Sequence, residues 1–463
     1  MKTTFLTILI SSALLAACGG GGGDTAAAPG PAGYGAQPVT CSTADQRSWL
    51  KAYMADQYFW SANLGAPNES ATSLDAYFRS LLFTPTDRFS NSQSTAQFTQ
   101  FFTDGTRTGY GYSLAFADAA QTILQVRFTE PLSPVGLAGL QRGDTIVSID
   151  GLTPAQITTG SLANVDTAGV PRSFTVRGAS GVVRTFSATS ANYALTPVLA
   201  TRVLTAPNGA RVGYLAYQEF IASSASALGN AFNTFRAAGV TELVVDLRYN
   251  GGGSVTTARN LASLMGGAGL NGQVFAGLRF NAKNSDSNVN YTFTSSASTL
   301  PAQPLEGLNR VFIIASSGTA SASELVINSL KPFRNVVTIG STTFGKPYGF
   351  VPRDACGTTY SAVNFDSVNA QGVGGYTGGL PATCTVSDDL SKALGDPSER
   401  RIAAALSYIQ TGTCPAVATS SGVLDGLEKA GSSQSAKTSE ISRNLKIRET
   451  AFGEVTPPRM VAD

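Results

Sequence analysis

The residues best suited to chemistry in this sequence are a serine, a lysine and a glycine-rich turn. Ser321 lies in the phrase Gly-Thr-Ala-Ser-Ala-Ser-Glu at residues 318–324, after an apolar run and at the start of a predicted helix. A hydroxyl placed there lies beside unpaired N–H groups and the positive end of the helix dipole, which favour a developing negative charge. By residue type alone, Ser317 and Ser323 are equally good candidates, and Ser321 could simply cap the helix.

A base for such a serine must come from a residue other than histidine, because the sequence contains none. This excludes Ser-His-Asp and Cys-His catalytic units and histidine-ligated zinc. Lysine can serve as the base when burial lowers the pKa of its amine. Lys346, in the phrase Phe344-Gly345-Lys346, follows Ser321 by 25 residues. If Lys346 is the base, activity should rise with pH as the amine loses its proton.

The glycine-rich turn reads Asp-Leu-Arg-Tyr-Asn-Gly-Gly-Gly at residues 246–253 and follows the apolar strand 243–245. Glycines let a backbone turn sharply and expose its N–H groups, which creates a concave anion-binding surface. The turn can therefore form half of an oxyanion hole, or it can be a tight strand-to-helix turn without a ligand.

The elements around these phrases alternate between strands and helices from about residue 203. We predict strands at 212–216, 243–247, 311–315 and 336–339, and helices at 225–238, 256–264 and 323–330. This alternation is typical of a layered α/β domain with a largely parallel sheet, in which sites lie at the carboxyl ends of the strands.

The rest of the chain falls into segments with different residue patterns, so the sequence predicts a multidomain α/β protein. Residues 41–103 form a predicted N-terminal helical cap with Trp49, Tyr53 and similar side chains in its core. Residues 104–190 form a β-rich domain, with strands at 123–128, 145–149, 174–177 and 182–186. The α/β core then covers 191–414, and a Ser-, Gly- and Lys-rich disordered tail covers 415–463.

Composition limits the class of function. The chain has 463 residues, of which 43% are hydrophobic, and charged residues make up only 13% against a typical value of about 25%. The formal net charge of +2 argues against a nucleic-acid-binding face.

The first 18 residues have the pattern of an export signal, with Lys2 ahead of an apolar stretch and small residues before Cys18. This pattern resembles the lipobox of bacterial lipoproteins, which implies a lipid on Cys18 that anchors the protein to a membrane. An ordinary secretory signal is the alternative. Residues 19–40 are a predicted flexible linker. Gly19 after the cysteine suits outer-membrane sorting in a Gram-negative source, by the same resemblance.

Four further cysteines, an even number in an exported protein, predict two disulfides. We expect Cys356 to pair with Cys384 and Cys41 with Cys414, although four cysteines allow three pairings. No Cys-x-x-Cys spacing occurs, so we expect no metal site.

Together, the three phrases resemble the catalytic core of the C-terminal processing peptidases, a family of serine peptidases with a Ser-Lys dyad. That core contains an Asp-Leu-Arg-x-Asn-x-Gly-Gly turn, then Ser-Ala-Ser-Glu, then Phe-Gly-Lys. The resemblance covers roughly residues 49–409, including Asp-Arg-Phe-Ser at 87–90 and Gly-Asp-Pro at 395–397. It implies that Ser321 is the nucleophile and Lys346 the general base, without a cofactor. It also implies an oxyanion hole made by the amides of Ala322 and of Gly252 or Gly253.

The β-rich domain resembles a PDZ domain, which binds an extended peptide by adding it to a sheet edge. The likeness rests on residues 109–114 and 133–151. It implies that the loop of Gly109, Tyr110, Gly111 and Tyr112 holds the terminal carboxylate of a peptide. A generic small β-domain is the alternative.

Two departures from the family pattern concern the lysine. Many members have glutamine four residues after the lysine, where this chain has Phe350, and some have an acidic residue eleven after the serine, where it has Pro332. A non-catalytic peptide-binding lipoprotein on a degenerate peptidase scaffold is therefore the alternative function. Residues 340–346 also fit most of a phosphate-binding loop, but Pro347 replaces the Ser or Thr that would bind Mg²⁺.

These observations predict a membrane-tethered periplasmic serine endopeptidase whose partners are polypeptide substrates of exported origin. The sequence predicts neither the substrate nor the oligomeric state.

Overall fold

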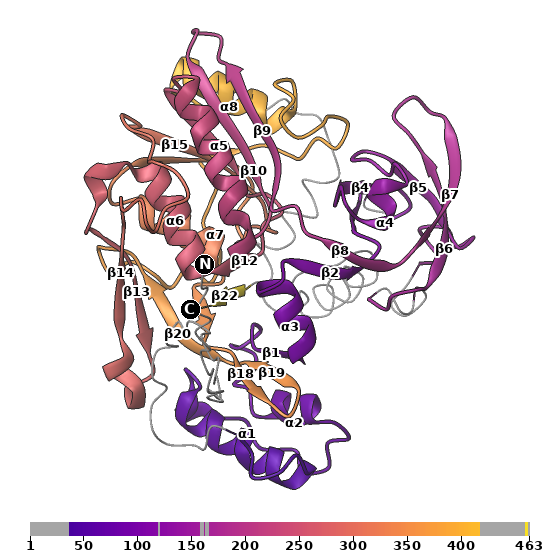
Figure 1. Ribbon diagram of the computed structural model, residues 1–463, viewed down its shortest axis with the longest axis vertical. Helices are drawn as coiled ribbons and strands as arrows, with labels where there is room; N and C mark the ends of the chain where they lie inside the picture. The colour runs from indigo at the N-terminus through magenta and orange to yellow at the C-terminus, as the bar shows by residue number, and fades with distance from the viewer. Residues whose placement is uncertain (1–36, 119–120, 158–161, 163–165, 417–458, 462–463) are drawn as a thin grey trace, which may run out of the picture. The chain divides into compact units, whose positions relative to one another are not determined.

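The structure is a computed structural model that describes residues 37–118, 121–157, 162, 166–416 and 459–461 (Figure 1). The predicted export signal with Cys18, nearly all of the predicted linker and most of the predicted tail lie outside these residues. None of the helices in the described ranges combines the length and the apolar character needed to cross a membrane.

The predicted N-terminal cap consists of two α-helices followed by a short strand and a third helix. These elements are α1 (Thr43–Gln57), α2 (Leu74–Ser80), β1 (Asn91–Ser94) and α3 (Thr95–Phe102), with a 3₁₀ turn η1 (Ser61–Asn63). Side chains of Ser42 and Ser73 cap α1 and α2 by accepting hydrogen bonds from backbone N–H groups of the first turn. The aromatic side chains of the cap are buried, as predicted, in a cluster shared with Tyr360 and Val363 of the core.

The β-rich segment contains a five-stranded antiparallel sheet in the order β3-β4-β5-β6-β7. Its strands are β3 (Tyr112–Phe116), β4 (Leu124–Thr129), β5 (Thr145–Ile149), β6 (Pro171–Arg177) and β7 (Val183–Thr189), with one short helix, α4 (Pro134–Leu137). A separate pair, β2 (Thr106–Gly109) and β8 (Ala191–Ala194), connects the segment to the rest of the chain. The four strands predicted here are confirmed, and β3 is an edge strand.

The α/β core is built on a six-stranded sheet in the order β21-β16-β15-β11-β10-β9. Its strands are β9 (Val198–Thr205), β10 (Arg211–Tyr217), β11 (Glu242–Asp246), β15 (Arg310–Ala315), β16 (Asn335–Gly340) and β21 (Cys384–Thr385). Neighbouring strands are parallel except for the pair β9 and β10. The predicted largely parallel sheet is therefore confirmed.

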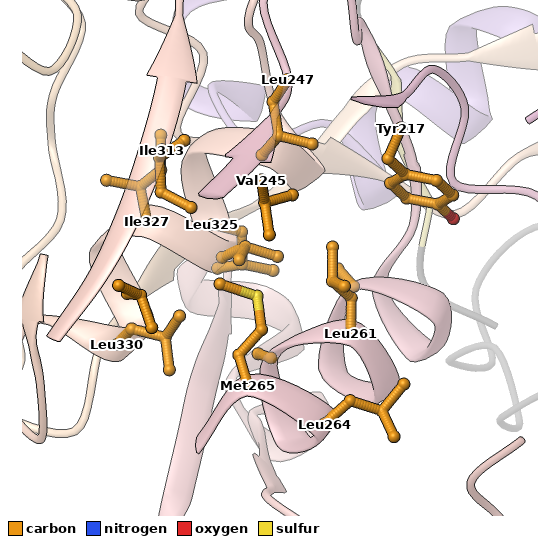
Figure 2. Close-up of a cluster of buried hydrophobic side chains, with 14 of the residues drawn as sticks. Tyr217, Val245, Leu247, Leu261, Leu264, Met265, Ile313, Leu325, Ile327 and Leu330 are labelled. Carbon is orange, nitrogen blue, oxygen red and sulfur yellow. The ribbon is translucent and has the colours of Figure 1, made fainter. Parts of the chain in front are cut away.

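Helices cover both faces of this sheet. They are α5 (Ala225–Ala237), α6 (Val255–Gly266), α7 (Ala322–Leu330) and α8 (Arg400–Thr411), with short 3₁₀ segments η2 (Ala222–Ser224), η3 (Ala268–Leu270) and η4 (Ala282–Ser287). Val245 and Ile313 pack with α6 and α7 side chains such as Met265, as Figure 2 shows. Val244 and Phe312 face the opposite cluster, which includes α8. The central strands β11 and β15 are apolar on both faces, which explains their continuous hydrophobic sequences.

A second six-stranded sheet, in the order β12-β22-β17-β20-β13-β14, was not predicted. Its strands are β12 (Gly252–Ser254), β13 (Val274–Phe280), β14 (Val289–Thr292), β17 (Tyr348–Phe350), β20 (Val363–Val368) and β22 (Arg459–Val461). The prediction of a disordered tail is wrong at residues 459–461, because β22 pairs with β12 and β17. A third, smaller sheet joins β1 to β19 (Thr358–Ser361) and β18 (Arg353–Ala355).

The two predicted disulfides are present, but the expected pairing of the four cysteines is wrong. Cys41 bonds to Cys356 and Cys384 bonds to Cys414, with Cα–Cα distances of 5.6 and 5.5 Å. Cys356 lies in the turn between β18 and β19, and that sheet contacts the cap that begins at Cys41. Cys414 follows α8, which packs beside β16, the neighbour of the strand that contains Cys384. The tertiary arrangement, rather than sequence distance, therefore sets the pairing.

Candidate active site

Ser321 lies after β15 and immediately before α7, in a backbone conformation that is rare for a residue with a side chain. Its φ and ψ angles are 59° and −113°, while its side chain is completely buried. Such a conformation costs free energy and persists where the surrounding structure enforces it, which often happens at functional sites. No hydrogen-bond partner for Ser321 Oγ occurs among the described residues. The hydroxyl thus lies in a strained turn at the N-terminal end of α7, where Ser321 and Glu324 have the arrangement of a capping box.

Hydrogen bonds join the Ser321 loop to the glycine-rich turn. Thr319 Oγ1 donates to the carbonyl of Leu247 (2.7 Å), and the N–H of Ala320 donates to the carbonyl of Asn250 (3.1 Å). Ser323 Oγ donates to the same Asn250 carbonyl (3.1 Å), so this alternative serine has a structural bond. Ser317, the other alternative, is exposed.

Backbone hydrogen bonds in the glycine-rich turn separate its two candidate oxyanion donors, Gly252 and Gly253. The N–H of Gly252 donates to Asn250 Oδ1 (2.8 Å), and the Gly252 carbonyl accepts from Phe220 N–H (3.1 Å). The N–H of Ser254 donates to the carbonyl of Phe220 (2.8 Å). Because backbone groups alternate along a strand, those of Gly253 face the opposite edge of β12. Ala322 opens α7, where the first N–H groups have no acceptor within the helix.

Lys346 lies between β16 and β17, and its side chain is completely buried. Its Nζ is 3.8 Å from the ring centroid of Phe350 and 6.0 Å from that of Phe89. A cation attracts the face of an aromatic ring within about 6 Å. Phe350, four residues after Lys346, therefore contacts the amine directly through its ring.

Glu324 connects the serine loop to the lysine loop, a role that the sequence analysis missed. Its Oε2 accepts from the N–H groups of both Ser321 and Lys346, each at 2.8 Å. Its Oε1 accepts from Gly345 N–H (2.7 Å) and from the Thr343 hydroxyl. Burial raises the pKa of this carboxyl, although the four hydrogen bonds oppose the rise. The backbone nitrogens of Ser321 and Lys346 both donate to Glu324 Oε2. They are therefore no farther apart than the combined length of these two hydrogen bonds.

The N-terminal cap supports the lysine loop from the other side. Arg88, from the Asp-Arg-Phe-Ser phrase, donates from Nη2 to the carbonyls of Phe344 (3.2 Å) and Gly345 (3.4 Å). Its guanidinium also lies over the rings of Phe344 and Phe89, at 4.7 and 4.9 Å. Burial lowers the pKa of Arg88. The cap thus contributes to the placement of Lys346.

A buried charge network supports the glycine-rich turn. Arg248 donates to Asp246 (2.9 Å), Asp388 (2.6 Å) and Glu399 (2.9 Å). Burial alone would raise the pKa of Asp388, but Arg248, Arg401 and Arg142 outweigh it and hold that pKa well below its usual range. Within the described ranges, no group of three or more His, Cys, Asp or Glu side chains could hold a metal ion.

Arg142 of the β-rich segment reaches the same turn. Its Nη1 donates to the Tyr249 hydroxyl (2.5 Å) and its Nη2 to Asp388 (2.9 Å). The ring of Phe128 stacks on Tyr249 at a centroid distance of 5.5 Å. Tyr249 belongs to the glycine-rich turn, so the β-rich segment contacts the loop that contains the candidate oxyanion donors.

The predicted peptide-binding loop lies at the entrance to the edge strand β3. Gly109 ends β2 and Tyr112 begins β3. The carbonyls of Tyr110 and Gly111 accept from Val135 N–H (3.2 Å) and Glu130 N–H (2.9 Å), and both tyrosine rings are buried. The loop is thereby fixed beside α4. Its role in peptide binding stays a prediction.

Two family models match this chain. Residues 211–354 match the model described as Peptidase family S41, and residues 45–91 match the Peptidase S41 N-terminal domain. The chain therefore carries one segment of the S41 peptidase type and one of the S41 N-terminal domain type, and S41 is a family of serine-type peptidases.

Curated proteins with similar sequences are carboxyl-terminal-processing peptidases. A carboxyl-terminal-processing protease of Picosynechococcus sp. is 28% identical over 247 residues, which are 53% of this chain and 55% of that protein. The chloroplastic carboxyl-terminal-processing peptidase 2 of Arabidopsis thaliana is 26% identical over 53% of this chain and 46% of its own length. The chain spans about half the length of these curated relatives.

A solved structure of a Bacteroides fragilis protein assigned to the S41 proteases has the same fold. It superposes with a TM-score of 0.64 at 24% identity and covers 79% of this chain and 97% of its own.

Proposed function

We propose that this protein is a serine endopeptidase that hydrolyses peptide bonds of polypeptide substrates with Ser321 and Lys346. The observation that supports this most directly is the shared hydrogen bonding to Glu324, whose Oε2 accepts from the backbone of both residues. A strained serine and a buried lysine are thereby brought to one place. The S41 domain match and the processing-protease relatives favour the same chemistry.

In the proposed mechanism, neutral Lys346 takes the proton of the Ser321 hydroxyl while Oγ attacks the peptide carbonyl carbon. The amides of Ala322 and Gly253 donate to the oxyanion of the tetrahedral intermediate. Protonated Lys346 then gives its proton to the leaving amine as the C–N bond breaks. Finally, Lys346 takes a proton from water as the water oxygen attacks the acyl ester. Lys346 then returns this proton to Ser321 Oγ as the ester C–O bond breaks, which releases the carboxylic acid and restores the serine and the neutral lysine.

We propose further that the β-rich segment is a PDZ-like domain that binds a peptide along β3, with residues 109–112 near the terminal carboxylate. The edge position of β3 supports this proposal, because an edge strand presents unpaired N–H and C=O groups to an incoming peptide. We also propose export and lipidation at Cys18, which the sequence alone supports.

The peptidase proposal predicts that the full chain cleaves unfolded casein and that a fluorophosphonate probe labels Ser321. Ser321→Ala should abolish both cleavage and labelling, because no other described side chain is placed to replace Oγ. Mass spectrometry of the labelled peptide identifies the serine, and a metal chelator should leave the rate unchanged. Labelling at another serine, or cleavage by Ser321→Ala, would contradict the assignment.

The contact through Arg142 predicts that the β-rich segment affects turnover. Arg142→Ala removes the bonds to Tyr249 and Asp388, and we expect kcat/KM for a peptide substrate to fall about tenfold, because hydrogen bonds to charged groups contribute about 1.5–3 kcal/mol. Arg177→Ala, which removes an exposed arginine of the same segment, is the matched control and should leave kcat/KM unchanged. Equal rates for both variants would show that the contact does not influence catalysis.

A further inference from the structure

Strand β22 lies at the candidate active site although the sequence around it predicts disorder. It pairs in parallel with β12, so that residues 459, 460 and 461 stand opposite Gly252, Gly253 and Ser254. On its other side Val461 stands opposite Phe350 of β17. β22 is therefore inserted between β12, which belongs to the glycine-rich turn, and β17, the strand that follows Lys346. Figure 1 labels β22 close to β12.

The register places β22 against the groups proposed to act on a substrate. One edge of β12 is bonded to Phe220, through Gly252 and Ser254, so the backbone groups of Gly253 face β22. Gly253 is the proposed oxyanion donor. Phe350, on the other side of β22, contacts the Lys346 amine with its ring.

Val461 fixes the strand in this position. Its side chain is 8% exposed, which is the burial of a core residue. Burial of an apolar side chain removes it from water, which stabilises the contact that buries it. A three-residue strand with one buried side chain is a weak contact by itself, but it belongs to the same chain as the site and does not have to be captured from solution.

We propose that residues 459–461 occupy the position in which an extended substrate segment binds, so that the chain blocks its own active site in competition with substrate. This inference rests on the peptidase function proposed above. Substrate strands and β22 would use the same edges of β12 and β17, and only one strand fits between them. The block is reversible, because no covalent bond joins β22 to the sheet.

An intramolecular competitor has a defined kinetic signature. It raises KM by the factor by which the blocked state exceeds the open state, while kcat is unchanged because saturating substrate displaces it. Substitutions that weaken β22 should therefore lower KM and leave kcat as it is.

The test is Val461→Glu in the full chain, which places a charge at the buried contact. We expect KM for a peptide substrate to fall about tenfold with kcat unchanged. Val289→Glu, at a 43% exposed position of β14 in the same sheet, is the matched control and should leave both constants unchanged. An unchanged KM in Val461→Glu would overturn the proposal.

A binding measurement separates this inference from the proposed catalysis. The probe is a synthetic peptide of residues 457–463, titrated by calorimetry or fluorescence anisotropy into the full chain carrying Ser321→Ala, with and without Val461→Glu. We expect about tenfold tighter binding when Val461→Glu frees the groove, and no binding of a peptide that itself contains the Val461→Glu change.

The two failures are then distinct. If the peptide binds as expected but no variant hydrolyses a substrate, the self-occupied groove stands and the peptidase proposal fails. If hydrolysis depends on Ser321 but the peptide binds neither protein, the peptidase proposal stands and self-occupation is refuted.

Discussion

Replacing Lys346 by arginine is expected to lower kcat/KM for a peptide substrate by about 10²–10⁴-fold, the usual contribution of a general base. Arginine keeps a positive charge beside Phe350, but its guanidinium does not lose its proton in proteins and cannot accept one from Ser321. Lys346→Met should show a loss of similar size, because it removes the base without adding a charge. The measurement is steady-state hydrolysis, with circular dichroism to verify the fold.

The matched control is Lys331→Met. Lys331 is exposed and follows the far end of α7, the helix that begins after Ser321. We expect its replacement to leave kcat/KM within about twofold of the original chain, because it lies outside the site. Activity retained in Lys346→Arg would exclude a base role for Lys346 and leave only a charge or packing role.

The second large effect is expected at Glu324, which we regard as a positioning residue. Each of its oxygens accepts two hydrogen bonds, so glutamine in either orientation directs an NH₂ group at a backbone N–H donor. We expect Glu324→Gln to lower kcat about 10²-fold, the cost of misplacing reacting groups by about 1 Å. The melting temperature should fall as well, because a buried donor left unsatisfied costs about 1–3 kcal/mol.

A purely structural role for Glu324 would change stability without changing chemistry, and this can be measured. Glu242→Gln is the control, since Glu242 bonds to Arg310 (2.6 Å) away from the site. At a temperature where both variants are folded, only Glu324→Gln should slow fluorophosphonate labelling of Ser321 and lower kcat. A lower melting temperature with unchanged labelling would contradict the positioning role.

Local patterns in the sequence predicted most of the scaffold. The strands 243–247 and 311–315 are apolar without interruption because both of their faces are covered by helices, and such runs are recognised without knowledge of neighbours. Helices α1 and α2 of the cap were predicted from their three- and four-residue periodicity, whereas α3 was not predicted. Ser321 and Lys346 were selected by motif spacing and by the absence of histidine.

The contacts between distant segments could not be predicted in this way. The disulfide pairing depends on which turns meet, and the role of β22 depends on a strand position left open between β12 and β17. Three residues of strand have no periodicity that distinguishes them from a polar tail. From the sequence, Phe350 was only a departure from the family pattern. In the structure its ring lies against the Lys346 amine.

The sequence by itself determined the chemistry that is available: a serine and a lysine at a characteristic spacing, a glycine turn, and no imidazole. Only the tertiary structure decided how these residues are held together. Glu324 joins two loops through hydrogen bonds to backbone N–H groups, which every residue except proline has and which therefore leave no trace in residue type. Likewise, Gly253 rather than Gly252 has its backbone groups on the edge of β12 that faces β22, because strand alternation fixes which backbone groups face Phe220.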